Sequence, residues 1–547
     1  MFRKSSKQPQ LDLFGSSQHL LKGKARDQYT DNQGWHNQFR QEIVSRIDED
    51  LFQVLFNDTM GAPNASISVL VGMLALKEGF GWSDWQLFEQ CRFNLLVRSA
   101  LGLFNITDSV PTESTYYLFR KRLHEHARDQ GEDLLQKTFA TITQQQIKEF
   151  NVNGRHIRMD SKLIGSNSAY FSRYEIIHQV LVSFYKSLSK AQCQRLSAEQ
   201  LDQLKALTDE EAGKTIYRST KEEITSRMQV LGLLIYKLLS LFRAQENEAY
   251  LLLERVFQEQ YKVAEEQAIE LRPREEIKAD SLQSPHDPDS TFRRKQDQKV
   301  KGYNVNLSET IDDDGLNLIT DVIVDKAHVS DVDFLQPAIE ASRQVTGQPV
   351  DNVYVDGGYQ SPDHDALCPD IDIVYTGMQG SAGRYDLQSG PDGLIVTDTR
   401  NGECYKARLV KKIKTSKEER WYIDTEEKRV YFSQQAIRAA ELRRQLRQRP
   451  REEIHKRNNV EATIFQLVYH LRNNKSKYRG LIKQRIWATC RSLWINLVRI
   501  INYIKECSPG GVTLCQRSVM NGTLAIYPSP FLKIWIQQSI FDLKNSD

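Results

Sequence analysis

The sequence lacks closely paired cysteines, long apolar runs and an apolar leader. Its seven cysteines are scattered and none has Cys-x-x-Cys spacing, so we expect neither a disulfide framework nor a zinc ribbon. The longest apolar run, from Val230 to Phe242, is interrupted by Lys237 and is too short to cross a bilayer. Residues 1–17 are polar, with no apolar signal core. These absences predict a protein of the reducing cytoplasm that does not associate with a membrane.

Acidic residues are missing from a long stretch near the C-terminus. Residues 462–505 contain nine Lys and Arg and no Asp or Glu, and residues 437–457 contain eight basic residues against three acidic ones. The net charge of the whole chain is only +3, so the distribution is more informative than the total. A stretch of one sign favours contact with a polyanion such as a phosphate backbone. The alternative is a solvated basic helix, although such helices usually intersperse acidic residues.

Length and composition are those of a soluble globular protein. The chain has 547 residues, of which 27% are charged and 40% apolar, so it has room for about two to four domains. Residues 1–37 are polar and weakly periodic, which predicts a flexible lead. Residues 38–150 carry apolar side chains at three- and four-residue steps, with a capping signal at Thr112 or Ser114. They predict an all-helical N-terminal domain.

The pattern changes to strands after residue 150. A strand is predicted around Asp160, and residues 170–276 then form a long helical insertion. Two alternating runs flank the turn sequence at 312–315, which predicts a hairpin. A capped helix is predicted to end near Gly347, and the buried strand that follows it ends at Asp356.

The C-terminal part adds a second insertion and the last helices. Residues 380–435 are rich in strand-forming side chains, and an Arg-rich helix, Pro450 and a helix through Glu461 follow. The order strand, hairpin, helix, strand is that of an RNase H-like fold, in which the first and fourth strands are neighbours. We therefore predict an α/β protein: an RNase H-like mixed-sheet catalytic core at 151–500 with helical and β insertions, an all-α domain before it and a tail at 501–547.

This fold would bring acidic side chains together. Asp160 and Asp356 would lie on neighbouring strands, where two carboxylates repel unless a cation lies between them. Glu461, at the edge of the apolar face of its helix, is the best candidate for a third carboxylate, although Glu452 and Glu453 are nearby alternatives. Such a set can hold two metal ions about 4 Å apart for in-line phosphoryl displacement. Arg457, one helical turn before Glu461, could orient that carboxylate or meet a phosphate.

Several segments resemble one protein family. The segments "MDSKLIGSN", "VYVDGGY" and "RNNVEATIFQLVYHLRNNKSKYRG" resemble the three catalytic segments of bacterial insertion-sequence DDE transposases. The segment "SPHDPDSTFRRKQDQKVKGYNVNLSET" resembles the stretch that leads into their second strand, and "GAPNASISVLVGMLALKEGFGWSDWQLFEQCRFNLLVRSALGL" is similar to their helical N-terminal domain. Together these similarities run from about residue 40 to 490.

The resemblance implies a function, a cofactor and partners. Asp160, Asp356 and Glu461 would be the catalytic, metal-binding triad, with two Mg²⁺ ions that Mn²⁺ can replace and no organic cofactor. The enzyme would cleave double-stranded DNA at the terminal inverted repeats of its element and join the freed 3′-hydroxyl to target DNA. A homodimer on DNA is implied because two ends must be brought together. The implied location is the bacterial cytoplasm, at the nucleoid.

The family signature around the third acid is only partly present. Arg457 and Glu461 match it, whereas Ile454 stands at its Tyr position and Val468 at its Lys position. Lys475, two helical turns beyond Val468, could replace the missing lysine if the helix stays regular, and Lys477 is a second candidate. Arg457, Lys475 and Lys477 are therefore the predicted DNA contacts of this segment.

Other motifs leave alternatives open. Arg120, Lys121 and Arg122 form a basic cluster that could bind the terminal repeats, although no helix-turn-helix spacing is present. Trp487 and Trp494 are expected to pack in helices, with base stacking as the alternative. Two other functions remain open. One is an RNase H-like nuclease that cuts without strand transfer. The other is a catalytically inactive DNA-binding protein derived from a transposase, an alternative that the valine at the family's Lys position, Val468, leaves open.

Overall fold

A computed structural model describes residues 1–507, with several short gaps. The gaps are residues 6–14, 58, 244–246, 265–267, 296–297, 313–314, 362–363, 365–367, 379–382, 391–392, 411–419 and 427. Most of the predicted tail at 501–547, and two residues of the predicted turn at 312–315, therefore lie outside the described residues.

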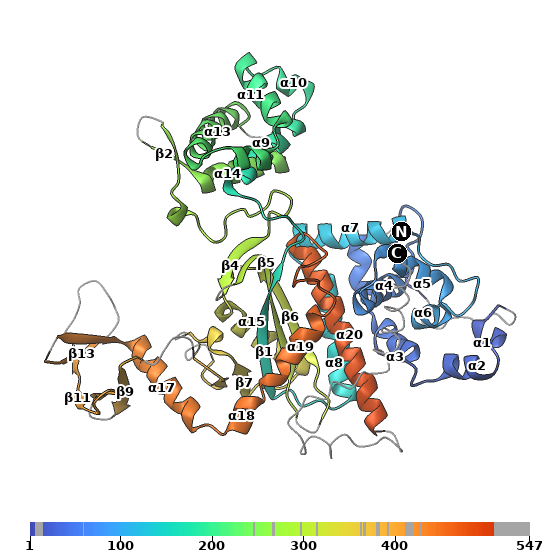
Figure 1. The fold of residues 1–547 in the computed structure, drawn as a ribbon. Coiled ribbons are helices and arrows are strands. Elements are labelled where there is room, and N and C mark those ends of the chain that lie inside the picture. The colour runs from blue at the N-terminus through green and yellow to red at the C-terminus, as the bar shows by residue number, and fades with distance from the viewer. Residues whose placement is uncertain are drawn as a thin grey trace. The chain divides into compact units, whose positions relative to one another are not determined.

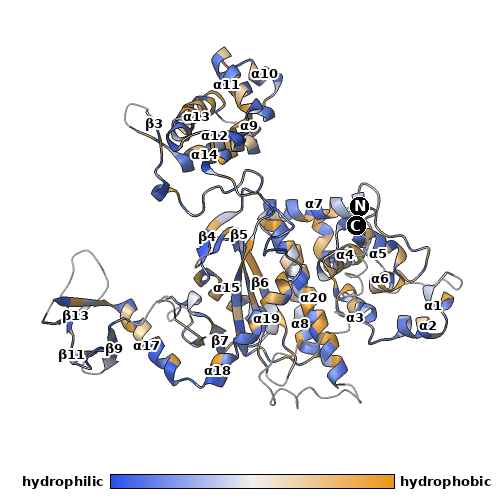
Figure 2. Ribbon diagram, in the orientation of Figure 1, coloured by the Kyte–Doolittle hydropathy of each residue, from blue (hydrophilic) through white to orange (hydrophobic). Residues whose placement is uncertain are grey.

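The N-terminal region is helical up to Glu149. Its helices are α1 (Ser17–Leu20), α2 (Gly23–Thr30), α3 (Trp35–Glu42), α4 (Ile67–Phe80), α5 (Asp84–Phe93), α6 (Leu95–Ala100), α7 (Glu113–Gln130) and α8 (Leu134–Glu149). Thr112 caps α7, because its hydroxyl accepts a hydrogen bond from the Thr115 amide. Figure 2 shows that α4 is rich in hydrophobic residues, and most of its side chains are buried.

A mixed sheet follows the helices (Figure 1). Its strands are β1 (His156–Gly165), β4 (Thr291–Lys295), β5 (Gln298–Thr310), β6 (Ile319–Lys326), β7 (Asn352–Val355) and β8 (Asp372–Tyr375). The order is β4-β5-β1-β7-β8, and β6 also pairs with β5. β1 is antiparallel to β5 and parallel to β7, which in turn is parallel to β8. The predicted fold class is confirmed: the sheet is consistent with an RNase H-like core, and the first predicted strand lies beside the fourth.

The two faces of β1 have different partners because successive side chains of a strand point to opposite faces. Ile157 and Met159 belong to a buried core with Phe334 and Ala338 of α15 (Val332–Thr346). As predicted, α15 ends at Gly347, which adopts φ 66° in the left-handed region that glycine favours. Arg158 and Asp160 point to the other face, where α19 (Asn458–Val468) packs on β1. The sheet thus has an apolar side and a side that carries charged groups.

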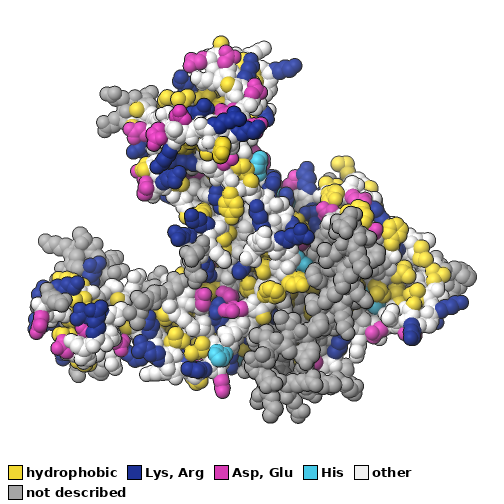
Figure 3. Space-filling model, in the orientation of Figure 1, with side chains coloured by type: hydrophobic (Ala, Val, Ile, Leu, Met, Phe, Trp, Pro, Cys, Tyr) yellow, Lys and Arg dark blue, Asp and Glu magenta, His cyan; other side chains and the backbone are white. Residues whose placement is uncertain are grey.

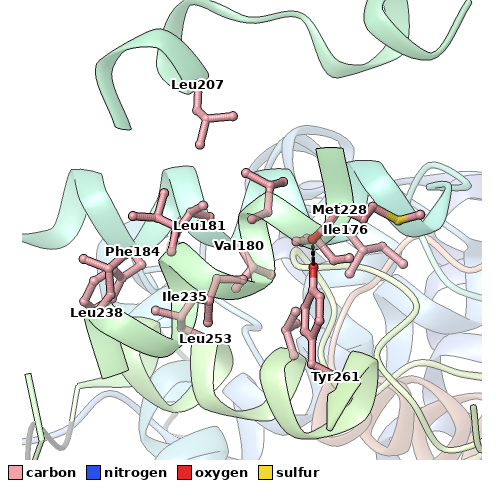
Figure 4. Packing of buried hydrophobic residues seen from close by; sticks show 14 of the residues in the cluster. Ile176, Val180, Leu181, Phe184, Leu207, Met228, Ile235, Leu238, Leu253 and Tyr261 are labelled. Carbon is pink, nitrogen blue, oxygen red and sulfur yellow. Dashed lines mark hydrogen bonds between the residues drawn. The ribbon is translucent and has the colours of Figure 1, made fainter. Parts of the chain in front are cut away.

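A helical segment separates β1 from β4, at the position of the expected insertion. It consists of α9 (Arg173–Ser187), α10 (Lys190–Cys193), α11 (Ala198–Asp209), α12 (Ala212–Arg218), α13 (Lys221–Leu241), α14 (Glu248–Gln260) and the hairpin of β2 (Tyr261–Val263) and β3 (Ile269–Leu271). Its hydrophobic core, which includes Phe184, Ile235 and Leu253, is drawn in Figure 4. In that core the Tyr261 hydroxyl donates to the Met228 carbonyl oxygen at 2.7 Å.

By length and composition alone, α13 could cross a membrane, and it is the one such helix among the described residues. Its side chains Leu231, Leu234, Ile235 and Leu238 are buried in the core that α13 shares with α9 and α14. The buried side chains of α13 thus pack inside a helical core.

A second set of strands follows the sheet. It comprises β9 (Tyr385–Gly390), β10 (Gly393–Asp398), β11 (Cys404–Lys406), β12 (Arg408–Leu409), β13 (Arg420–Asp424) and β14 (Arg429–Ser433). These strands form two small three-stranded antiparallel sheets. Leu394, Val396, Ile423 and Phe432 share a core with Ile437 of the next helix, α17 (Gln434–Gln448).

The predicted helix from Pro450 through Glu461 is instead two helices. α18 (Arg451–His455) ends before Lys456, and α19 starts anew at Asn458. The Lys456 carbonyl oxygen accepts a hydrogen bond of 2.9 Å from Arg158 Nη1, so it has a side-chain partner at the point where the helix is interrupted. α19 in turn ends at Val468, and the last helix of the described residues is α20 (Leu481–Cys507).

α20 packs against α4. A Cβ atom on Gly79 would lie 2.4 Å from the ring of Trp494, so this approach requires glycine. Trp487 and Trp494 are 3% and 7% exposed, which confirms their expected role in packing and leaves no face for base stacking.

Candidate functional site

The three predicted acids come from three different elements. Asp160 lies in the middle of β1, and its Oδ1 accepts a hydrogen bond from the Ser161 amide at 2.8 Å. Asp356 follows the last residue of β7, and its Oδ1 accepts from the Gly358 amide at 2.8 Å, which caps a short 3-10 turn. Glu461 lies in the first turn of α19 and is exposed. Asp160 and Asp356 are thus held by backbone groups, and Glu461 extends from a helix beside them.

The guanidinium of Arg457 lies among these carboxylates. Its Nη2 is 3.0 Å from Asp160 Oδ1 and 3.9 Å from Asp356 Oδ2, and its Nη1 is 3.1 Å from Glu461 Oε1. The guanidinium is nearly buried, whereas the Glu461 side chain is 62% exposed. Three acids that are far apart in the sequence therefore converge on one cationic group.

Burial and charge act in opposite directions at this centre. Burial raises the pKa of Asp160, and the neighbouring Asp356 raises it further, while Arg457 and the Ser161 amide act to lower it. For Arg457, burial acts to lower the pKa, but the charges of Asp160 and Asp356 outweigh it and the net shift is upward. The buried Asp160 carboxylate is thus costly to ionise without a neighbouring cation, which Arg457 supplies.

The donor set fits a hard divalent cation. Carboxylate oxygens are the ligands that Mg²⁺ prefers, and these three already surround one positive group. As they stand, no three acidic, His or Cys side chains of the described ranges are grouped closely enough to hold a metal ion. The three carboxylates are instead arranged around the Arg457 guanidinium.

A buried ionic cluster fixes α19 to the sheet, and the sequence analysis did not single it out. Glu309 of β5 is fully buried and lies 2.5 Å from Arg158 Nε and 2.8 Å from Arg499 Nη2. It also accepts a hydrogen bond of 2.7 Å from the Thr463 hydroxyl, two residues after Glu461. Burial acts to raise the pKa of Glu309, but Arg499 and Arg158 outweigh it and the net shift is downward. A glutamate inside an otherwise buried strand was the available signal.

Glu309→Ala is expected to lower the free energy of unfolding by about 3–5 kcal/mol, because two arginines would lose the carboxylate that compensates their buried charge. Chemical denaturation measures the change. The control is Glu270→Ala, whose partner Lys262 lies 3.3 Å away at the surface and whose loss should cost about 1 kcal/mol or less. Equal, small effects of the two substitutions would contradict the positioning role given to Glu309.

The segment "SPHDPDS" makes buried contacts within the fold. Asp287 is buried, accepts hydrogen bonds from the Ser166 and Tyr303 hydroxyls, and accepts from the Gly480 amide at 3.0 Å. Asp289 accepts from the Leu481 amide at 3.0 Å. These carboxylates tie the end of β1 and the middle of β5 to the start of α20.

The predicted DNA contacts near α19 are only partly available. Because α19 ends at Val468, Lys475 does not lie on a continued helix; its Nζ donates to the Ser168 carbonyl oxygen at 2.7 Å and lies over the Tyr170 ring. Lys477 Nζ donates to the Gly81 carbonyl oxygen at 2.8 Å. Val468, at the family's lysine position, is buried. Arg457 remains the predicted contact that lies among the acids.

Several basic side chains of the stretch at 462–505 bond to other groups of the protein. Arg485, Arg491 and Arg499 all donate to protein groups: the Val324 carbonyl oxygen, the backbone around Gly79 and the Glu309 cluster. Arg472 and Arg479 are exposed.

Figure 3 shows dark blue and magenta side chains interspersed over the surface of the α9–α14 segment, where no single sign of charge dominates.

The basic cluster on α7 is divided between two faces. Arg120 lies 3.5 Å from Asp84 and stands over the Tyr116 ring, whereas Arg122 stands over Phe56. Arg120 also lines an open pocket between α7 and the start of α20, together with Lys121, Arg128, Tyr117 and Lys483. Glu78 and Glu125 also line this pocket, so its basic side chains outnumber its acidic ones without excluding them.

Comparison with known proteins identifies the N-terminal helices. Residues 28–122, from α2 through the first half of α7, match the family described as Transposase domain (DUF772). These residues therefore form a transposase domain, and the class of protein that carries it acts on DNA. No curated protein and no solved structure matches the chain.

Proposed function

We propose that the chain is a DNA transposase that cleaves DNA at the ends of its insertion sequence and joins the freed ends to target DNA. The observation that carries the proposal is the convergence of Asp160, Asp356 and Glu461 from three elements around Arg457. An RNase H-like core with such acids, in a chain that has a transposase domain at 28–122, supports phosphodiester chemistry.

The residues have separate roles in this proposal. Mg²⁺ held by Asp160, Asp356 and Glu461, as two ions or with Mn²⁺ in their place, would neutralise charge on the phosphate and activate the attacking oxygen. The backbone hydrogen bonds to the two aspartates keep their carboxylates oriented. Arg457, whose planar fork matches phosphate oxygens, binds the DNA backbone beside the acids. Glu309 and Arg158 hold the start of α19 against β1.

The partner is double-stranded DNA, as terminal inverted repeats and as target. The α7 pocket with Arg120 and Lys121 suits the phosphate backbone, and the exposed Arg472 offers further positive charge. Two transposon ends must react together, so the proposal includes a homodimer on DNA. The setting is the bacterial cytoplasm, at the nucleoid.

The proposal is tested with the wild-type protein and a labelled duplex that carries the end of the element in which the gene lies. We expect cleavage at the end and joining to a second duplex with Mg²⁺ or Mn²⁺, and neither product with EDTA. Cleavage without joining would favour an RNase H-like nuclease. Specific binding without any chemistry would favour a catalytically inactive, transposase-derived DNA-binding protein.

A further inference from the structure

The solvent face of α19 carries an aromatic pair. Phe465 is 63% exposed and Tyr469, at the end of the helix, is 40% exposed. Their ring centroids are 5.7 Å apart and their planes meet at 67°. The opposite face of the helix, with Ile464, Leu467 and Val468, is buried. Most of the Phe465 side chain therefore lies outside the core beneath α19.

This pair shares its face with the third acid of the site. Phe465 and Tyr469 follow Glu461 by four and eight residues, and side chains four residues apart on a helix are neighbours, with Cβ atoms about 6 Å apart. Glu461 is exposed on the same side. A group bound against Phe465 would therefore lie one helical turn from the carboxylate.

The charges around the pair suit a nucleic acid. No acidic residue occurs after Glu461 as far as Lys505, and the exposed Arg472 follows Tyr469 by three residues. His470, two residues after the end of α19, lies with its Nε2 3.3 Å from the Gly79 carbonyl oxygen of α4 in the transposase domain. Aromatic side chains combined with nearby positive charge bind unpaired nucleotides.

We infer that Phe465, supported at its edge by Tyr469, stacks on an unpaired nucleobase at the DNA end. The inference rests on the proposed function, because it requires a DNA phosphate at the acidic triad. A strand that places a phosphate at Glu461 carries the adjoining base past the next turn of α19. A base that leaves the duplex loses its stacking neighbours, and the Phe465 ring supplies a new one. This surface would make an opened end a better ligand than a paired one.

The test compares two labelled duplexes of the element's end, one fully paired and one with mismatches at its last two base pairs. Binding is measured by fluorescence anisotropy with Ca²⁺, so that cleavage does not interfere. We expect the wild type to prefer the opened end by about tenfold, which is within the range for stacking of one base on an aromatic ring. Phe465→Ala should remove the preference and keep the affinity for the paired end, and Phe465→Trp should retain it. The control is Tyr217→Ala, which removes an aromatic ring that is 92% exposed on α12.

Three outcomes distinguish failure of the stacking inference from failure of the proposed transposase function. A preference that survives in Phe465→Ala overturns the stacking role. A change in oligomeric state of Phe465→Ala, measured by sedimentation without DNA, assigns the pair to an interface between copies and also overturns it. Failure of the wild type to bind either duplex counts against the proposed function itself.

Discussion

Replacing Asp356 with Asn is expected to lower metal-dependent DNA cleavage by roughly 10²- to 10³-fold, the scale seen when one group that stabilises developing charge is removed. Asn keeps the shape of the side chain, and its carbonyl oxygen can still accept the hydrogen bond from the Gly358 amide. The negative charge that a divalent cation needs is lost. The measurement is the initial rate of cleavage of the end-bearing duplex with Mg²⁺, followed by strand transfer.

Asp351→Asn is the matched control for this substitution. Asp351 lies just before the other end of β7, is exposed, and pairs with Arg155 at 2.6 Å. The same change of charge there should leave cleavage within about twofold, since an exposed ion pair contributes little. Loss of cleavage in both variants, or in neither, would show that Asp356 has no special place in the chemistry.

The fold and the convergence of the acids could be predicted because both depend on local patterns. Each pattern predicts one element of the fold. Alternation predicts the strand around Asp160, capping signals predict the helix that ends at Gly347, and a short apolar run predicts the strand before Asp356. The parallel pairing of β1 with β7 follows from their order, and it brings the two strands together. For these features, nearby residues contain enough information.

The surroundings of the acids could not be predicted in this way, because they depend on contacts between distant residues. The break before α19 coincides with the hydrogen bond between Arg158 and the Lys456 carbonyl oxygen, 298 residues apart in the chain. The same holds for the lysines. Lys475 and Lys477 read as free charges in the sequence, but each donates to a backbone carbonyl oxygen of a distant segment.

Arg457→Gln is expected to increase the affinity of the DNA-free protein for Mn²⁺ by about tenfold or more. The guanidinium lies 3.0 Å from Asp160 and 3.1 Å from Glu461, so an arriving divalent cation must displace it or bear its repulsion. Two unit charges about 4 Å apart interact by about 4 kcal/mol at the effective dielectric of a protein surface, and about 1.4 kcal/mol already corresponds to tenfold in affinity. Calorimetry or the electron paramagnetic resonance signal of free Mn²⁺ measures the difference.

The control for Arg457 is another arginine with the same arrangement. Arg449 bridges Asp372 of β8, at 2.6 Å, and Glu453, four residues later at 3.0 Å. Arg449→Gln should leave the Mn²⁺ affinity unchanged, because its acids are not those of the site. Thermal unfolding gives a second readout, since Mn²⁺ should raise the melting temperature of Arg457→Gln more than that of the wild type.

DNA should reduce the difference between wild type and Arg457→Gln. A backbone phosphate offers the guanidinium a bidentate partner, so a bound DNA end would draw Arg457 away from Asp160 and Glu461 and leave their oxygens for the metal. The wild type is therefore expected to bind Mn²⁺ more tightly with the end-bearing duplex than without it, and Arg457→Gln to gain less. If Arg457→Gln binds Mn²⁺ no better than the wild type, Arg457 does not compete with the metal and instead orients the carboxylates that bind it. Coupling in the expected direction would delay assembly of the cleavage centre until DNA is in place.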